Sequence, residues 1–160
     1  MVRNGFVESV HHGLAAVTAA DGTLAHAVGD ATTPVFPRSS AKPLQAVAMV
    51  RAGTRLSVPH LALACSSHSG EDVHLTGVTA SLAASGLALA DLDNTPDFPV
   101  DEDARIAWIR AGRPRAALAQ NCSGKHAGML AACVAAGWPT AGYRDPGHPL
   151  QALIRATVAD

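Results

Sequence analysis

The spacing of hydrophobic residues changes along the sequence from a strand-like to a helix-like period, and this change constrains the fold most. Residues 14–19 and 23–28 are mainly apolar and flank Asp21-Gly22, a dipeptide that favours the positive φ angles of a hairpin turn. From Leu44 onward, apolar residues instead recur at the spacing of an amphipathic helix. The chain is therefore predicted to be α+β, with two or three antiparallel strands followed by helices.

Five helices and one buried strand are predicted after the hairpin. The first helix has an apolar stripe from Leu44 to Arg51 and ends at Gly53, and the others are predicted at 71–85, 104–111, 125–137 and 150–158. The short apolar run at 61–65 is predicted to be a buried strand. The last helix reaches Asp160 without a Gly or Pro to end it. Residues 1–160 are therefore predicted to be the N-terminal portion of a single, longer domain.

The composition fits a globular protein and excludes several classes of partner. Hydrophobic residues make up 48% of the chain, charged residues 16%, and the net charge is −1. Because no basic patch is present, neither nucleic acid nor an anionic membrane is an expected partner. No apolar run approaches the roughly 20 residues of a membrane helix, and residues 1–5 do not begin a secretion signal. A cytoplasmic location is predicted, with the three cysteines present as thiols.

Lysine is rare in this chain and occurs in two suggestive contexts. Of the 12 basic residues, ten are Arg, and the only lysines are Lys42 and Lys125. A buried lysine can lose its proton at an accessible cost, whereas arginine in practice cannot. Both lysines are therefore candidates for amine chemistry. The alternative is that these two lysines have no special role and remain by chance in a composition that favours arginine.

The first candidate site is the segment 38–43, with the sequence RSSAKP. Ser39 and Lys42 are three residues apart, so their side chains can meet on a first helical turn, where an unprotonated lysine could activate the serine. Pro43 fits only a first turn and disfavours helical angles at Lys42. The pair is therefore predicted to lie at the beginning of a helix. The alternative is that Ser39 or Ser40 caps the helix and Lys42 is a solvated charge.

The second candidate site is the segment 65–72, with the sequence CSSHSGED. It places three hydroxyls and an imidazole directly after the predicted buried strand, where α/β sheets often bind ligands. Ser69 and Asp72 resemble a capping box for the next helix. His68 could equally be a buried polar residue with its hydrogen bonds satisfied. Ser67 is left without a structural role.

The third candidate site is the segment 121–128, with the sequence NCSGKHAG. It fails the phosphate-loop pattern because Ala119 and His126 stand at positions that require Gly and Ser or Thr, so no nucleotide is expected. Cys122 and Lys125 could form half of a metal site, although lysine is an uncommon ligand. Alternatively, the backbone amides near Gly124 could form an anion-binding nest, or the segment could simply begin a helix.

Taken together, these motifs resemble the rhizobial-type L-asparaginase family, also called asparaginase II. The resemblance rests on segments 36–45, 65–71 and 121–130, supported by 7–13, Tyr143 and 148–151, and so covers essentially the whole chain in order. Each motif alone is weak, but their ordered combination is specific. The resemblance implies a fold similar to serine β-lactamases and glutaminases, with an antiparallel sheet flanked by helices.

The resemblance also implies an activity and a set of site residues. The activity is hydrolysis of L-asparagine to L-aspartate and ammonia, carried out by a protein expected to be a homodimer. Ser39 and Lys42 match one Ser–Lys pair, and Ser67 matches the serine of a second. Cys122 and Lys125 match two positions of a Cys/Lys/Cys metal site, with zinc as the candidate metal. The residues predicted to bind substrate are Arg38, His68, Asn121, Gly124 and His126.

Three departures from the family pattern keep other hypotheses open. Members of the family continue past residue 160, and the second lysine and third metal ligand lie in that part. Asp97 stands where the family usually has a histidine. The alternative is therefore an inactive or truncated paralogue that acts only with a complementary chain. A penicillin-recognising hydrolase shares Ser-x-x-Lys but also needs Ser-Asp-Asn and Lys-Thr-Gly, which the chain lacks.

Overall fold

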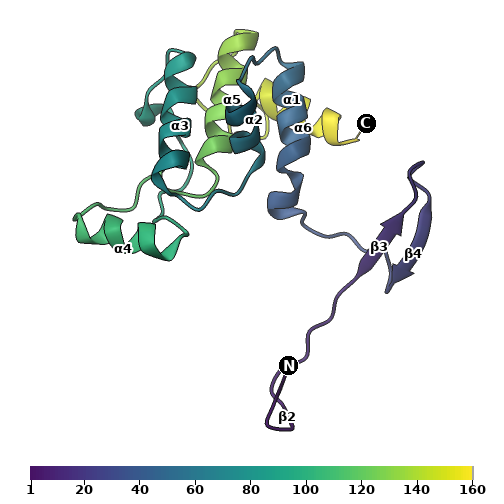
Figure 1. Cartoon of the computed structure of the whole chain (residues 1–160). Helices are drawn as coiled ribbons and strands as arrows, with labels where there is room; N and C mark the ends of the chain where they lie inside the picture. The colour runs from purple at the N-terminus through teal and green to yellow at the C-terminus, as the bar shows by residue number, and fades with distance from the viewer. Residues whose placement is uncertain (160) are drawn as a thin grey trace. The chain divides into compact units, whose positions relative to one another are not determined.

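The computed structural model describes residues 1–159 as two units, residues 1–36 and the part from Pro37 onward (Figure 1). The first unit contains two antiparallel hairpins. Strand β1 (Val2–Arg3) pairs with β2 (Phe6–Val7), and β3 (Ala15–Thr18) pairs with β4 (Leu24–Val28). The predicted hairpin around Asp21-Gly22 is confirmed.

The turn between β3 and β4 is held by its own side chains. Gly22 has a φ of +85°, which glycine adopts without steric cost. The Thr23 hydroxyl and amide both donate to Asp21 Oδ1, at 2.6 and 2.9 Å. These hydrogen bonds lower the pKa of the Asp21 carboxyl.

The second unit is helical. It begins with a 3₁₀ turn, η1 (Arg38–Ala41), and contains a second one, η2 (Leu89–Asp91). The α-helices are α1 (Lys42–Arg51), α2 (Val58–Cys65), α3 (Asp72–Ala84), α4 (Glu102–Arg110), α5 (Ser123–Ala136) and α6 (Pro149–Ala159). None of the helices within residues 1–159 is long and apolar enough to span a membrane.

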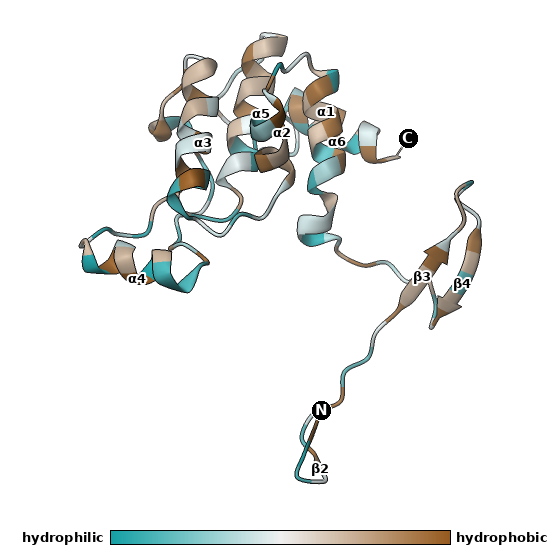
Figure 2. Cartoon of the chain, in the orientation of Figure 1, coloured by the Kyte–Doolittle hydropathy of each residue, from teal (hydrophilic) through white to brown (hydrophobic). Residues whose placement is uncertain are grey.

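Helix α5 forms the centre of the second unit. It packs against α1, α2, α3 and α6, and ten of its residues are buried. In Figure 2 most of α5 has the colours of hydrophobic residues, in contrast to the hydrophilic ends of α4. Around it lies the main core, which includes Met49, Val78, Leu82, Leu130, Tyr143 and Leu150.

Two glycines let α5 approach its neighbours closely. A Cβ on Gly124 would lie 2.7 Å from the Leu63 carbonyl oxygen, and one on Gly128 would lie 2.9 Å from Met49 Sδ. A larger residue at position 124 would push α5 away from the α2 backbone, and one at position 128 would displace the Met49 side chain. This packing holds the first turn of α5 against the end of α2, where the segment with Ser67 begins.

Most of the predicted elements are confirmed, and the strand at 61–65 is wrong. That run belongs to helix α2. Pro59 lies in its first turn, where a missing amide hydrogen costs nothing, and a short apolar run has the same pattern in either element. The structure agrees with the predicted α+β class in a general sense. The described residues form helices and two separate two-stranded sheets, and they do not form one sheet flanked by helices.

The late motif at 148–151 has a structural explanation. The Leu150 amide donates to His148 Nδ1 at 3.1 Å, and His148 Nε2 lies 2.9 Å from the Pro139 carbonyl oxygen. His148 therefore satisfies an orphan amide at the beginning of α6. Gln151 Nε2 donates to the Tyr143 carbonyl oxygen at 2.8 Å, which ties α6 to the preceding loop.

Candidate active site

Ser39 and Lys42 lie where η1 continues into α1. Arg38, just before Ser39, has a φ of +51°, an uncommon conformation for a residue with a side chain. The prediction that the pair begins a helix is confirmed. The expectation that Pro43 would disfavour helical angles at Lys42 is wrong, since φ is −60° and ψ is −40° there. The Lys42 amide closes the preceding 3₁₀ turn onto the Ser39 carbonyl oxygen, which fixes these angles.

The capping alternative for these residues is also wrong. The cap positions are Pro37 for η1 and Ala41 for α1, and neither helix has a side-chain cap. The Ser40 hydroxyl donates instead to the Pro37 carbonyl oxygen. Lys42 is only 3% exposed, so it is not a solvated charge.

A chain of hydrogen bonds connects Lys42 to both candidate serines. Lys42 Nζ donates at 2.7 Å to the Ser66 carbonyl oxygen and at 2.7 Å to Ser67 Oγ. Ser67 Oγ donates in turn to Ser39 Oγ at 2.8 Å. The sequence spacing predicts a direct contact between the Ser39 and Lys42 side chains, but in the structure Ser67 connects the two by hydrogen bonds. The three residues predicted as catalytic therefore lie together.

The segment with Ser67 is anchored through its neighbours. The Ser66 hydroxyl donates to the Leu63 carbonyl oxygen at 2.9 Å. The His68 amide donates to the Asn121 carbonyl oxygen at 3.1 Å.

The predicted capping box between Ser69 and Asp72 is wrong, because Glu71 is the cap residue of α3 and makes no side-chain cap bond. Ser69 Oγ donates to Glu71 Oε2 at 2.5 Å instead.

His68 is a buried anchor for this segment. Its Nε2 lies 2.8 Å from Ser123 Oγ, which itself donates to the Leu118 carbonyl oxygen at 2.7 Å, so the ring proton is on Nε2. His68 Nδ1 is buried without a partner. Burial first, and then the charges of His74 and Lys42, lower the pKa of His68 to about 4. Because its donor nitrogen is used inside the protein, this geometry fits the structural alternative better than substrate binding.

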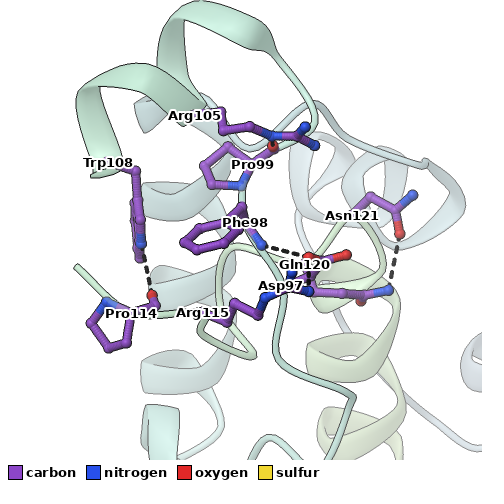
Figure 3. A network of polar contacts seen from close by, with 9 residues as sticks. All are labelled: Asp97, Phe98, Pro99, Arg105, Trp108, Pro114, Arg115, Gln120 and Asn121. Atoms are coloured by element: carbon purple, nitrogen blue, oxygen red, sulfur yellow. Dashed lines mark hydrogen bonds and ion pairs between the residues drawn. The ribbon is translucent and has the colours of Figure 1, made fainter. Parts of the chain in front are cut away.

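The turn at the beginning of α5 is held by Gln120, a residue that belongs to none of the motifs found in the sequence (Figure 3). Gln120 Nε2 donates to Asn121 Oδ1 at 3.0 Å, and Gln120 Oε1 accepts from the Cys122 amide at 2.9 Å. The Asn94 side chain donates to the same Oε1 at 3.1 Å. The Cys122 thiol lies 3.1 Å from Asn121 Oδ1. These bonds fix Asn121 and Cys122 relative to each other.

Asp97, the residue that departs from the family pattern, has a structural role. Its backbone pairs with Ala116, and its Oδ1 accepts from the Phe98 amide at 2.8 Å. Arg115 Nη1 lies 3.1 Å from the same oxygen (Figure 3). This pair is exposed, so it adds little stability. The backbone pairing positions the segment that leads to Asn121.

Lys125 carries positive charge at the beginning of α5, next to the buried ring of His126. Lys125 is half-buried, and burial lowers the pKa of its ammonium, an effect that the nearby Cys122 opposes. Burial, followed by the charges of Lys125, Arg144 and Lys42, lowers the pKa of His126 to about 3. His126 Nδ1 lies 2.8 Å from the Tyr143 hydroxyl. Gly124 contributes close packing against α2.

The model of the family described as L-asparaginase II matches residues 1–160. The chain belongs to the L-asparaginase II family. A comparison with curated proteins finds no significant match. Membership in the L-asparaginase II family suggests asparaginase-type hydrolysis as the class of reaction.

A complete zinc site does not fit the described residues of this L-asparaginase II chain. Cys122 and Lys125 stand one helical turn apart, but tetrahedral zinc needs four ligands. Within residues 1–159, no group of three or more His, Cys, Asp or Glu side chains could hold a metal ion. The Cys122 thiol also lies against Asn121 Oδ1.

Proposed function

We propose that this chain carries the acyl-forming residues of an amidohydrolase that converts L-asparagine to L-aspartate and ammonia. Membership in the L-asparaginase II family supports this class of reaction. The observation that carries the proposal is the hydrogen-bonded chain from Lys42 through Ser67 to Ser39. A serine becomes a nucleophile when a base takes its proton, and an unprotonated lysine can be that base.

In this proposal Ser39 is the nucleophile and Ser67 relays its proton. When Lys42 is unprotonated, its amine accepts, and both hydroxyls turn so that Ser39 donates to Ser67 and Ser67 donates to Lys42. Ser39 Oγ then attacks the side-chain amide carbon of asparagine, its proton passes to Ser67, and the Ser67 proton passes to Lys42. The new C–O bond forms an acyl-enzyme, and the C–N bond breaks as the same relay returns a proton to the leaving ammonia. Water then releases aspartate and regenerates Ser39.

Two features favour Ser39 for this role. It is at the outer end of the hydrogen-bonded chain, directly after the left-handed Arg38, and strained connections of this kind often present a nucleophile. It also lies in the turn that leads into α1, where the helix dipole stabilises developing negative charge.

The charges near the site suit an amino-acid substrate. Lys42, Lys125 and Arg144 all act electrostatically on His126. Within residues 1–159, the acidic residue that forms an ion pair with one of these three is Asp93, which pairs with Arg144 at 3.4 Å. Uncompensated positive charge favours a ligand that carries a carboxylate. L-Asparagine has one.

The decisive experiment is ammonia release from L-asparagine by the purified chain. Ser39→Ala is expected to abolish turnover, whereas Ser40→Ala is the matched control and should leave it nearly unchanged. An electrophilic asparagine analogue should label Ser39. After digestion with trypsin, which cuts after Arg38 and Arg51, the label should be on the peptide 39–51. Labelling of Ser67 would overturn the choice of nucleophile. A folded chain without turnover of asparagine or glutamine would contradict the proposed function.

A further inference from the structure

The proton of the Tyr143 hydroxyl determines the state of His126. Tyr143 is 1% exposed, and its hydroxyl accepts a hydrogen bond from the Asp93 amide at 3.2 Å. A buried phenol must donate its own proton to an acceptor. The acceptor within reach is His126 Nδ1, at 2.8 Å. His126 Nδ1 is therefore unprotonated, and the ring hydrogen is on Nε2.

The two buried histidines of the site differ in what their Nε2 atoms can reach. His68 Nε2 is occupied by Ser123. His126 Nε2 has no partner within the described residues, yet it is not among the buried polar side-chain atoms that lack one. Although the His126 ring is only 8% exposed, this nitrogen therefore retains access to solvent and to a small ligand.

The surroundings of His126 indicate which ligand atom the Nε2 hydrogen would meet. His126 is in the first turn of α5, next to Lys125, and it experiences the charges of Lys125, Arg144 and Lys42. A neutral imidazole N–H near a helix N-terminus is a good donor to an oxygen that bears negative charge. The nearby cations also favour such an oxygen.

We propose that His126 donates its Nε2 hydrogen to an anionic oxygen of the substrate, and that Tyr143 is the positioning residue that fixes the required tautomer. The oxygen belongs either to the substrate carboxylate or to the oxyanion formed when the serine attacks. This inference rests on the proposed hydrolysis, but the tautomer can be measured independently of turnover.

The first test is the tautomer of His126 in the whole chain labelled with ¹⁵N-histidine. At neutral pH, two-bond ¹H–¹⁵N spectra should show a protonated Nε2 and an unprotonated Nδ1, with His126→Gln used to assign the signals. In Tyr143→Phe, the two tautomers should mix. A wild-type His126 that is protonated on Nδ1 overturns the proposal, whether or not the chain hydrolyses asparagine.

The second test separates the two possible oxygens by kinetics. His126→Ala should lower kcat/KM by about 10²-fold or more, the usual effect of losing a preorganised donor. A fall mainly in kcat identifies the oxyanion, and a rise mainly in KM identifies the carboxylate. His126→Gln should recover part of the loss, because its amide nitrogen can replace Nε2, and Tyr143→Phe should fall between the wild type and His126→Ala.

A control and a contrary outcome complete the test. His60→Gln, on the partly exposed surface of α2, should leave both constants unchanged. Folded His126→Ala with wild-type constants would overturn the proposal. A wild-type chain that shows no turnover contradicts the proposed function instead, and the tautomer measurement then decides the assignment of Nε2 by itself.

Discussion

Ser67 Oγ donates a hydrogen bond to Ser39 Oγ at 2.8 Å, although the two serines are 28 positions apart in the sequence. The contact joins the beginning of α1 to the segment that follows α2. Ser67 is therefore the side chain that connects Lys42 to Ser39 through hydrogen bonds. The Ser-x-x-Lys spacing therefore describes only part of the arrangement, because the serine and the lysine are linked by a residue from elsewhere in the fold.

Ser67→Ala should reduce asparagine turnover about as severely as Ser39→Ala, because either change breaks the same proton path. General-base assistance contributes typically about 10² to 10⁴ in rate. The double variant should be little worse than each single variant, since residues that act as one unit are not additive. The measurement is kcat for the four proteins. Fully additive losses would mean that the serines act independently.

Lys42→Arg and Lys42→Met should both abolish turnover, but for different reasons. Arginine keeps a positive charge but cannot give up its proton at accessible pH. Methionine removes the donors to the Ser66 carbonyl oxygen and Ser67 Oγ, at 2.7 Å each. Leaving buried acceptors unpaired costs roughly 1–3 kcal/mol, so denaturant unfolding should show this destabilisation for Lys42→Met. Retained activity in folded Lys42→Arg would exclude Lys42 as the base.

Gly124→Ala should lower both stability and activity. The new Cβ would lie 2.7 Å from the Leu63 carbonyl oxygen, so α5 and α2 would have to separate. Overpacking of this kind costs typically about 1–3 kcal/mol. It would also move the segment with Ser67, which follows α2. Gly147→Ala is the matched control, because a Cβ there meets nothing within 4 Å. Equal unfolding midpoints for the two variants would contradict the close packing described here.

Ser123→Ala should destabilise the fold without removing any proposed catalytic group. It leaves the buried His68 Nε2 without its partner at 2.8 Å. The expected loss is about 1–3 kcal/mol in the free energy of unfolding. Ser57→Ala is a suitable control, since Ser57 precedes α2 but makes no side-chain cap bond. If Ser123→Ala were as stable as the control, the role of His68 as an anchor would be wrong.

Local sequence patterns predicted most of the helices because each has a clear period and a defined end. The helix from Ser123 ends at Gly137 in the left-handed conformation, as expected for a C-terminal glycine. The run at 61–65 was misassigned because five apolar residues show no period of their own, and only its packing against α5 settles it as a helix. The antiparallel sheet expected from the family resemblance is not formed by the described residues beyond the two hairpins.

The site was predictable where residues are close in sequence and unpredictable where contacts are tertiary. The motifs selected Ser39, Lys42 and Ser67, and the structure brings these three together. No local pattern could place Ser67 between the other two. Gln120 and Asn94 were missed for the same reason, since amides that orient a turn leave no spacing signal.

Stability should decrease as the pH falls below about 6.5, in part because of His68. Mainly because of burial, the pKa of His68 in the folded protein is about 4, below the ordinary histidine value of 6.5. Between these values the unfolded chain binds a proton at this residue and the folded chain does not. The contribution of neutral His68 is therefore complete above pH 6.5 and is lost progressively toward pH 4, with a slope of at most about 1.4 kcal/mol per pH unit for one proton. Urea unfolding at pH 7, 6 and 5 measures this slope. His68→Gln should be less stable overall but should have a shallower slope, and an unchanged slope would show that His68 is already free to titrate in the folded protein.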